Sequence, residues 1–371
     1  MPTTTTTTMP AGRAGRSHGA SMNASMNTVS IRELRKSFDD VEVLHGLDLD
    51  VQPGTIVGLI GPSGCGKTTT VRLMTGLLAP TSGEASIGGT PSVHLSSAQR
   101  ARIGYLPQTP ALFPDLSLME NLSFHASMYG LPLRCRQRLC SVLDWVELTD
   151  DAGKRVADAS GGMQRRLALA AAFVHDPDIV FLDEPTAGID PILRDKIWKQ
   201  FRDVAATGKT LVVTTQYVGE AGMCDQVGLL SDGELLLVDT PANLRRAAFE
   251  GEVLDVVTSR PLSAAEVSRL GAHEFVIGEI ERTDVSEIRI VVDDAAHAVE
   301  HVDRMLTELG VEVFEVSEHE VDYDEAFVKV VQRHRTGRGN SREGDVEATA
   351  SGAPSNTAEP AGAEGSSEAG T

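Results

Sequence analysis

The apolar residues of this chain recur first at strand spacing and then at helical spacing. From Val29 the segments V-S-I-R-E-L and V-E-V-L-H-G-L-D-L-D-V alternate, and T-I-V-G-L-I leads into Gly61. The apolar runs I-V-F-L at 179–182 and T-L-V-V-T-T at 210–215 have the length of buried strands, and helical patterns separate them. Alternating helices and strands predict an α/β fold with a parallel sheet flanked by helices.

Helical spacing dominates two segments of this first region. A helix is expected after the glycine-rich stretch that begins at Gly61, and A-P-T-S-G at 79–83 ends it. Residues 96–158 are mostly helical in pattern. Their apolar positions include Leu116, Leu118, Leu122 and Phe124. The first region therefore predicts one domain over 28–248 that contains a helical subdomain at about 96–158.

A second region begins near residue 249. E-V-L-D-V-V-T at 252–258 predicts a strand, a Ser-capped helix follows at 263–270, and two alternating segments predict further strands. Residues 294–309 place apolar side chains on one helix face and stop at Gly310. A strand and a closing helix follow. The order β-α-β-β-α-β over 249–335 predicts a small α+β module of ferredoxin-like type.

Both ends of the chain have compositions that do not support a packed core. Residues 1–27 are mostly Thr, Ser, Gly and Ala, and residues 336–371 are rich in Gly, Ser, Ala and Glu. Both segments are therefore predicted to be disordered. Met9, Met22 and Met26 leave the start of translation open.

The net charge of −20 is unevenly distributed. Residues 1–249 carry 26 acidic and 23 basic groups, whereas residues 250–335 carry 21 and 8 and residues 336–371 carry 6 and 2. The second region is thus an acidic module, which argues against nucleic acid as a partner because phosphate contacts need clustered Lys and Arg. A solvated acidic surface is the simpler interpretation of this charge.

The four cysteines, Cys65, Cys135, Cys140 and Cys224, lack the spacing of a zinc site or a disulfide framework. A reducing cytosol is the expected compartment. The sequence has no run of about 18 apolar residues and no signal-type apolar core at its start, so a membrane pore would have to come from another chain.

The sequence G-P-S-G-C-G-K-T at 61–68 lies between a predicted strand and a predicted helix. This is the context of a phosphate-binding loop, whose backbone N–H groups turn toward phosphates. Lys67 would reach the β- and γ-phosphate oxygens, and the Thr68 hydroxyl would ligate Mg²⁺. A purely structural glycine turn is improbable in this context. The predicted nucleotide contacts are Gly61, Pro62, Ser63, Gly64, Cys65, Gly66, Lys67, Thr68 and Thr69.

Two carboxylates, Asp183 and Glu184, end the apolar strand I-V-F-L. Charges at the end of a buried strand are costly unless a cation or phosphate chemistry uses them. We expect Asp183 to hold Mg²⁺, through water, and Glu184 to orient the attacking water as the general base. An acidic pair that only caps the turn before Pro185 is the alternative.

A second glycine-rich stretch, Ser160, Gly161 and Gly162, opens a predicted helix upstream of the two carboxylates. A helix start of this kind can bind a phosphate oxygen through its N–H groups and the positive end of its dipole. A chain with two such helix starts is predicted to contact nucleotide from two sides.

Together these motifs resemble those of the ATP-binding subunits of ABC transporters, from about Val29 to residue 245. The resemblance implies ATP and Mg²⁺ as ligands, and it implies that Gln108, in Y-L-P-Q, contacts Mg²⁺ and the attacking water. It also implies that residues 160–162 contact the γ-phosphate held by an opposite subunit. The segment Ala187–Asp190 resembles the loop that crosses the dimer seam, which includes Asp190 among the nucleotide contacts. Phe38 has the position of a ring that stacks on adenine, with ordinary core packing as the alternative.

The chain departs from this family pattern at three positions. Ala159 and Met163 flank the S-G-G stretch where the family has Leu and Gln. Gln216, in T-T-Q-Y-V, replaces the usual histidine. An amide can donate a hydrogen bond to the γ-phosphate but cannot carry a proton at neutral pH, which excludes a mechanism in which Gln216 shuttles a proton. A mechanism in which Glu184 is the base and Gln216 only holds the phosphate remains open. Gln216 followed by Tyr217 resembles drug-exporter ATPases of the daunorubicin-resistance type.

His297 and His301 in the second region have the i, i+4 spacing of a metal-binding pair. No third ligand accompanies them, and a solvated helix face is the simpler interpretation.

The resemblance implies a catalytic ATPase that dimerises, as a homodimer or with a related ATPase, and drives a separate membrane permease from the cytoplasmic face of the membrane. Leu112 and Phe113 are candidate permease contacts, and export is favoured over import. The alternative is a soluble ATPase of the same family in translation or DNA maintenance, but the paired domains or coiled coil of those types are missing. A P-loop kinase or small GTPase does not explain residues 160–162.

Overall fold

The computed structural model of the chain describes residues 28–132, 135–278, 280–319 and 321–349, with side chains to residue 336. The predicted disordered segment 1–27 and the tail from residue 350 lie outside the described residues. The chain divides into a compact unit that ends at Val330 and a second one from Val331. Within the described residues no helix is long and apolar enough to cross a membrane.

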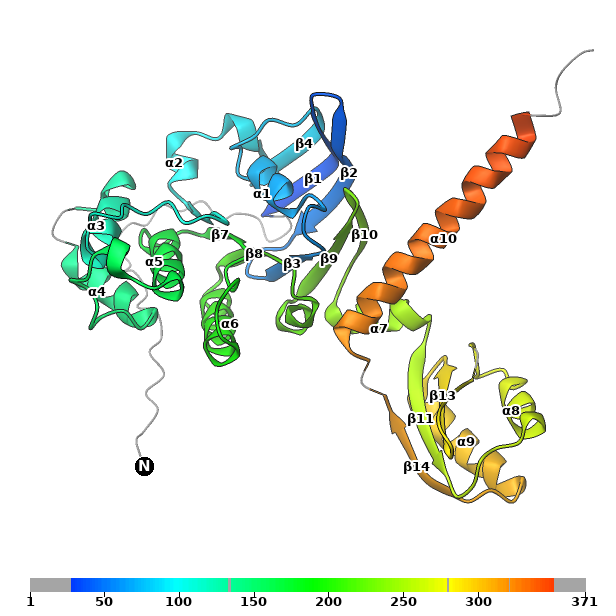
Figure 1. The fold of residues 1–371 in the computed structure, drawn as a ribbon. Helices are drawn as coiled ribbons and strands as arrows, with labels where there is room; N and C mark the ends of the chain where they lie inside the picture. Colours follow the sequence, from blue (N-terminus) through cyan, green and yellow to red (C-terminus); the bar gives the residue numbers. More distant parts are fainter. Residues whose placement is uncertain (1–27, 133–134, 279, 320, 350–371) are drawn as a thin grey trace, which may run out of the picture. The chain divides into compact units, whose positions relative to one another are not determined.

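The centre of the first unit is a six-stranded sheet of order β10-β9-β3-β8-β7-β6 (Figure 1). All neighbouring strands are parallel except β9 and β10. The parallel core predicted from the apolar runs is therefore observed. The strands are β3 (Ile56–Ile60), β6 (Ile103–Leu106), β7 (Ile179–Asp183), β8 (Thr210–Thr215), β9 (Gln226–Ser231) and β10 (Glu234–Asp239).

A second, antiparallel sheet of order β2-β1-β4-β5 packs against the first one. Leu59 and Phe181 of the central sheet share a core with this second sheet and with α1. Ile60 and Leu182 point the other way, into a core with α5 (Gly161–Phe173) and α6 (Pro191–Ala206). This alternation follows from the pleat, which turns successive side chains to opposite faces. The elements added here are β1 (Val29–Phe38), β2 (Val41–Val51), β4 (Ser82–Ile87), β5 (Thr90–Pro91) and α1 (Lys67–Met74).

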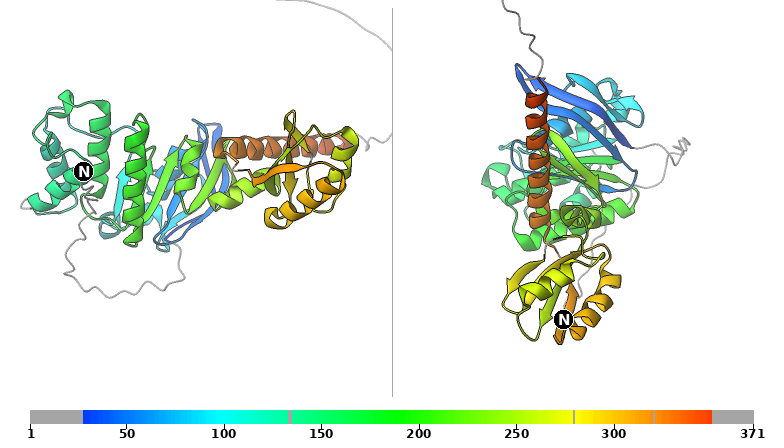
Figure 2. Two further views of the ribbon diagram at one scale, coloured as in Figure 1. Left: turned by 90° about the horizontal axis from the view of Figure 1, so that it is seen from below. Right: turned by 90° about the vertical axis from the view of Figure 1, so that its right-hand side faces the viewer.

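Helices of residues 118–173 gather at one end of the central sheet, as the left view of Figure 2 shows. Capping sets the starts of two helices: Ser117 and Glu120 form a capping box at the start of α3, and Asp190 followed by Pro191 opens α6. Residues 103–106 of the segment predicted as helical subdomain instead form β6, because a short apolar run completes the sheet edge. The helical elements are η1 (Ser92–His94), α2 (Ser97–Arg100), α3 (Leu118–Met128), α4 (Arg136–Trp145), η2 (Val156–Asp158), α5 (Gly161–Phe173), α6 (Pro191–Ala206), η3 (Val218–Met223) and α7 (Pro241–Phe249).

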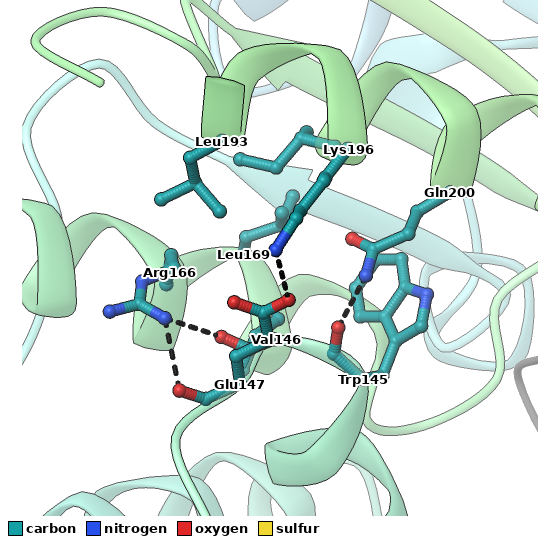
Figure 3. A pocket seen from close by; sticks show the side chains of 9 residues that line it. Trp145, Val146, Glu147, Arg166, Leu169, Leu193, Lys196 and Gln200 are labelled. Atoms are coloured by element: carbon teal, nitrogen blue, oxygen red, sulfur yellow. Dashed lines mark hydrogen bonds and ion pairs between the residues drawn. The ribbon is translucent and has the colours of Figure 1, made fainter. Parts of the chain in front are cut away.

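The end of α4 meets α5 and α6 around a small pocket (Figure 3). From α6, Lys196 pairs with Glu147 at 3.1 Å and Gln200 donates to the Trp145 carbonyl at 2.5 Å. From α5, Arg166 donates to the carbonyls of Val146 and Glu147 at 3.0 Å. Polar contacts thus join the helical segment to the helix that follows residue 190.

The acidic module contains a four-stranded sheet of order β12-β13-β11-β14, in which all neighbours are antiparallel. Its core lies between one face of this sheet and the helices α8 and α9. The helix predicted over 294–309 is observed as α9. The elements are β11 (Glu252–Thr258), α8 (Ala264–Gly271), β12 (Glu281–Asp284), β13 (Glu287–Val292), α9 (Ala295–Glu308) and β14 (Val313–Glu318).

The closing helix α10 (Tyr323–Thr349) is longer than the sequence predicts. Residues 336–349, predicted as part of a disordered tail, continue it. Once a helix has been nucleated, each further residue adds one backbone hydrogen bond. A polar sequence can therefore continue a helix that a packed segment has begun.

Candidate functional site

A pocket opens where the loop after β3 meets the ends of the central strands. Most of the residues around it were predicted from the sequence, and Val43 on β2 was not, because its apolar side chain carries no chemical signal. The lining residues are Val43, Ser63, Gly64, Gly66, Lys67, Thr68, Thr69, Gln108 and Glu184.

The phosphate loop, residues 61–68, is shaped by its glycines. Gly64 and Gly66 adopt φ of 83° and 108°, a left-handed region that favours glycine. A Cβ at Gly61 would lie 2.0 Å from the Leu230 carbonyl oxygen, so the loop approaches β9 too closely for a side chain. The loop leads directly into α1, whose first N–H groups and dipole form an anion site.

Lys67 is buried, with 4% of its surface exposed. Its Nζ donates to the carbonyls of Gly61 at 2.7 Å and Pro62 at 2.9 Å, and it lies 4.0 Å from Glu184 Oε1. The ammonium group is therefore positioned between the loop and the carboxylate. Burial raises the pKa of the neighbouring Cys65 thiol, which keeps that side chain protonated and chemically inert at neutral pH.

Asp183 is fully buried at the end of β7. Its Oδ1 accepts hydrogen bonds from Thr68 Oγ1 at 3.1 Å and Thr214 Oγ1 at 2.6 Å. Within the described part of the chain, its Oδ2 has no hydrogen-bond partner. A buried, unpaired carboxylate oxygen beside a threonine hydroxyl matches the oxygen ligands that Mg²⁺ prefers, so these residues fit the implied cation.

Glu184 follows Asp183 in a left-handed conformation, with φ of 51°. Non-glycine residues adopt this conformation where the surroundings enforce it. Here the Glu184 N–H bonds both the carbonyl and the hydroxyl of Thr214 at 3.0 Å. The carboxylate consequently turns into the pocket, where Gln108 Nε2 donates to its Oε2 at 3.3 Å.

Gln216 follows β8, which neighbours β7 in the sheet (Figure 1). Its Oε1 accepts a hydrogen bond from Ser63 Oγ at 3.0 Å, which places it against the phosphate loop. The structure thus brings together Lys67, Thr68, Asp183, Glu184, Gln108 and Gln216, residues from four separate segments of the chain.

Other predicted residues lie elsewhere. Ser160 caps α5 by accepting from the Met163 N–H at 3.3 Å, and a Cβ on Gly161 or Gly162 would meet nothing within 4 Å. None of these three lines the pocket around Lys67.

Asp190 caps α6 by accepting a hydrogen bond from the Leu193 N–H at 3.0 Å. Phe38 is 44% exposed at the end of β1, which contradicts the core-packing alternative, and Lys36 Nζ lies 5.0 Å from its ring centre.

Arg165 on α5 is a residue of the site that the sequence analysis missed. Its buried guanidinium donates to five carbonyls, those of Pro107, Gln108, Asp183, Glu184 and Pro185. Burial lowers its pKa, while Asp183 and Glu184 oppose that shift. The sequence feature that could have indicated this role is the pair Arg165–Arg166 in an otherwise largely apolar helix.

The metal-compatible pair His297 and His301 does not form a larger cluster. The ring centres lie 4.4 Å apart, and His301 Nδ1 bonds the His297 carbonyl at 2.8 Å. Among the described residues, no group of three or more His, Cys, Asp or Glu is arranged to hold a metal ion.

The parallel sheet, the phosphate loop and the carboxylate strand end define a P-loop nucleoside triphosphatase. Residues 44–187 match the sequence family described as ABC transporter. The chain is 34% identical over 261 residues to the Nod factor export ATP-binding protein I of Paraburkholderia xenovorans, covering 70% of this chain and 83% of that protein. It is 35% identical over 305 residues to the daunorubicin resistance ATP-binding protein DrrA3 of Streptomyces coeruleorubidus, covering 81% and 94%. The chain therefore belongs to the ABC transporter ATP-binding proteins and is an ABC transporter ATPase.

A solved structure extends the comparison to the fold. The ATP-binding cassette MJ0796, in a dimeric post-hydrolysis state bound to ADP and phosphate, matches with a TM-score of 0.54 and 28% identity. The match covers 57% of this chain and 98% of the cassette.

Proposed function

We propose that this chain dimerises around two ATP molecules, hydrolyses them and drives a separately encoded membrane permease that exports its substrate. The observation that carries the proposal is the separation of two phosphate-binding features. Lys67, Thr68 and Glu184 line one pocket, whereas Ser160–Gly162 open α5 outside it, uncovered by the chain's own side chains. A second subunit can place its α5 start over the first subunit's nucleotide, which completes each site.

Each pocket residue has a role in this proposal. Lys67 binds the β- and γ-phosphates and neutralises charge that develops on them. Asp183, through water, and Thr68 would hold Mg²⁺, which would stabilise the negative charge that develops on the phosphates. Glu184 orients and deprotonates water, with Gln108 fixing one of its oxygens.

Gln216 contacts the γ-phosphate through its side-chain amide. Its distance of 3.0 Å from Ser63, in the phosphate loop, supports this role. Because an amide does not titrate near neutral pH, the proton from water goes to Glu184.

Export is supported by the names of the relatives, a Nod factor export protein and a daunorubicin resistance protein. Leu112 and the exposed Phe113 precede α3 and are proposed to contact the permease at the cytoplasmic face of the membrane. The substrate class is set by the permease.

The acidic module, residues 249–335, is proposed to be a separate ferredoxin-like domain. Its strand order β12-β13-β11-β14, with two helices on one face, supports that assignment. The alternative of a soluble ATPase in translation or DNA maintenance is less well supported, since both named relatives belong to export or resistance systems.

Glu184→Gln tests the proposal. The amide keeps the shape of the side chain but cannot accept the proton from water, so turnover should fall by about 100-fold or more while ATP binding persists. Size-exclusion chromatography with MgATP should then show a trapped dimer, whereas the wild type returns to monomer as it hydrolyses. Normal turnover in the variant would contradict the role of Glu184 as the general base. A variant that binds ATP but stays monomeric would contradict an ATP site shared between two subunits.

A further inference from the structure

Tyr217, the residue after Gln216, stacks against a side chain of α6. The guanidinium carbon of Arg194, on α6, lies 4.3 Å from the centre of the Tyr217 ring. Stacking of this kind combines dispersion with the attraction of a cation to the ring face. Since Tyr217 adjoins Gln216 in the chain, the stack limits where Gln216 can lie against Ser63.

Arg194 also contacts the loop that precedes its own helix. Its Nη2 donates to the Ile189 carbonyl at 3.4 Å, and its backbone N–H donates to the Asp190 carbonyl at 2.9 Å. The segment 187–190, here called the crossing loop, is therefore joined to α6 by side-chain and backbone contacts. One side chain reaches both the crossing loop and the residue next to Gln216.

A third contact of Arg194 is incompletely formed. Its Nε lies 3.7 Å from Oε1 of the buried Glu220, too far for a hydrogen bond. Glu220 Oε1 accepts instead from Thr186 Oγ1 at 2.7 Å. Within the described part of the chain, Arg194 Nε and Glu220 Oε2 are both buried without a hydrogen-bond partner. Buried polar groups of this kind favour any small movement that pairs them.

We infer that Arg194 is a positioning residue that couples the crossing loop to Gln216 through Tyr217; the inference rests on the proposed contact of Gln216 with the γ-phosphate. When the crossing loop moves against a second subunit, the start of α6 moves with it and Arg194 closes on Glu220. The stacked Tyr217 ring then fixes Gln216 in the position that serves the γ-phosphate. The contact of the crossing loop with a second subunit is thereby linked to the contact of Gln216 with the γ-phosphate in the same subunit.

The test compares Arg194→Ala, Tyr217→Ala and the double variant in the full chain, with MgATP as the substrate. Each single change should lower kcat about tenfold and leave KM within about twofold, because it alters the position of Gln216 and not the phosphate loop. The double variant should be no worse than either single one, since both remove the same coupling. Tyr217→Phe keeps the ring and should restore kcat.

Lys199→Ala is the matched control, because it removes a positive charge from an exposed position of the same helix and should leave kcat unchanged. Wild-type kcat in Arg194→Ala, or losses that multiply in the double variant, would overturn the inference. Gln216→Ala separates this failure from that of the proposed function. If Gln216→Ala loses turnover while Arg194→Ala does not, only the inference fails; if Gln216→Ala is unimpaired, the phosphate role of Gln216 fails and the inference with it.

Discussion

At the scale of single residues, Arg165 does the most to organise the site. It donates to carbonyls on both sides of the catalytic candidates, from Pro107 and Gln108 to Asp183, Glu184 and Pro185. A guanidinium offers five N–H donors in a fixed plane, which no other side chain can match. The conformation of Glu184, with φ of 51°, therefore has support from Arg165 as well as from Thr214.

Arg165→Lys tests this support. Lysine keeps the charge but has three donors on a flexible stem, so at least two carbonyls lose their partner and the unfolding free energy should fall by about 2–4 kcal/mol. Turnover should fall further than the affinity for ATP, because Glu184 loses its fixed position. Urea unfolding and steady-state ATPase kinetics measure both effects. The exposed Arg136→Lys is the control, and equal stability of the two variants would contradict this account.

His175 makes stability depend on pH. Its ring stacks on Tyr129 at 3.6 Å and its Nε2 bonds the Ile103 carbonyl at 3.0 Å, while burial lowers its pKa to about 4. The unfolded chain takes up this proton near pH 6.5, so the stability that His175 contributes is complete above that value and is lost as pH falls toward 4.

Replacing His175 with Phe should flatten that dependence. Between pH 7 and pH 5 the unfolding free energy of the wild type should fall by about 2 kcal/mol more than that of the variant. Urea unfolding at the two pH values gives the comparison, with the exposed His273→Gln as the control. Parallel pH dependences in wild type and His175→Phe would show that another group titrates.

At the scale of elements, α6 connects the parts of the ATPase domain. It starts at the Asp190 cap, contacts Tyr217 through Arg194, and holds the end of α4 through Lys196 and Gln200 (Figure 3). The Lys196–Glu147 pair is about half exposed, and exposed ion pairs contribute little. Gln200 instead satisfies a half-buried carbonyl, that of Trp145.

The two contacts should therefore differ in energy. Gln200→Ala leaves the Trp145 carbonyl without its partner and should cost about 1–2 kcal/mol, whereas Lys196→Ala should cost less than about 0.5 kcal/mol. Thermal or urea unfolding of the two variants ranks them. A larger loss for Lys196→Ala would mean that the ion pair, and not the amide, joins the two helices.

How far the sequence predicts these elements depends on whether their signal is local. The buried strands at 179–182 and 210–215, the phosphate loop and helix α9 were predicted because periodicity and glycine spacing mark them directly. Strand β6 was missed because four residues are too few to show a period. Arg165 was missed because its five partners are backbone carbonyls, which only the folded chain brings together.

At the scale of the whole molecule, the start of α10 ties the acidic module to the ATPase domain. Tyr323 lies against Gly222, and the guanidinium of Arg245 lies 4.1 Å from its ring centre. Phe327 packs against the main core of the ATPase domain. The chain thus leaves that domain after α7, forms the module, and returns to it at α10.

Tyr323→Ala should loosen this second attachment. The loss of one half-buried ring should leave ATP binding intact but make the connection around Gly251 more accessible, so limited trypsin digestion should cleave near Arg245 and Arg246 several-fold faster. Glu308→Ala, an exposed change on α9, is the control. Equal cleavage rates would show that the module is held by the connection after α7 alone.

The open space above Gly161 and Gly162 has a genetic consequence. Because a Cβ at either position meets nothing within 4 Å, alanine there should leave folding, abundance and the chain's own pocket intact. In the proposed dimer such a chain would still pair with a normal copy and cover its nucleotide with a defective surface. An allele of this kind should therefore be dominant-negative: in a cell that expresses both copies, transport should fall below the level set by the normal gene alone.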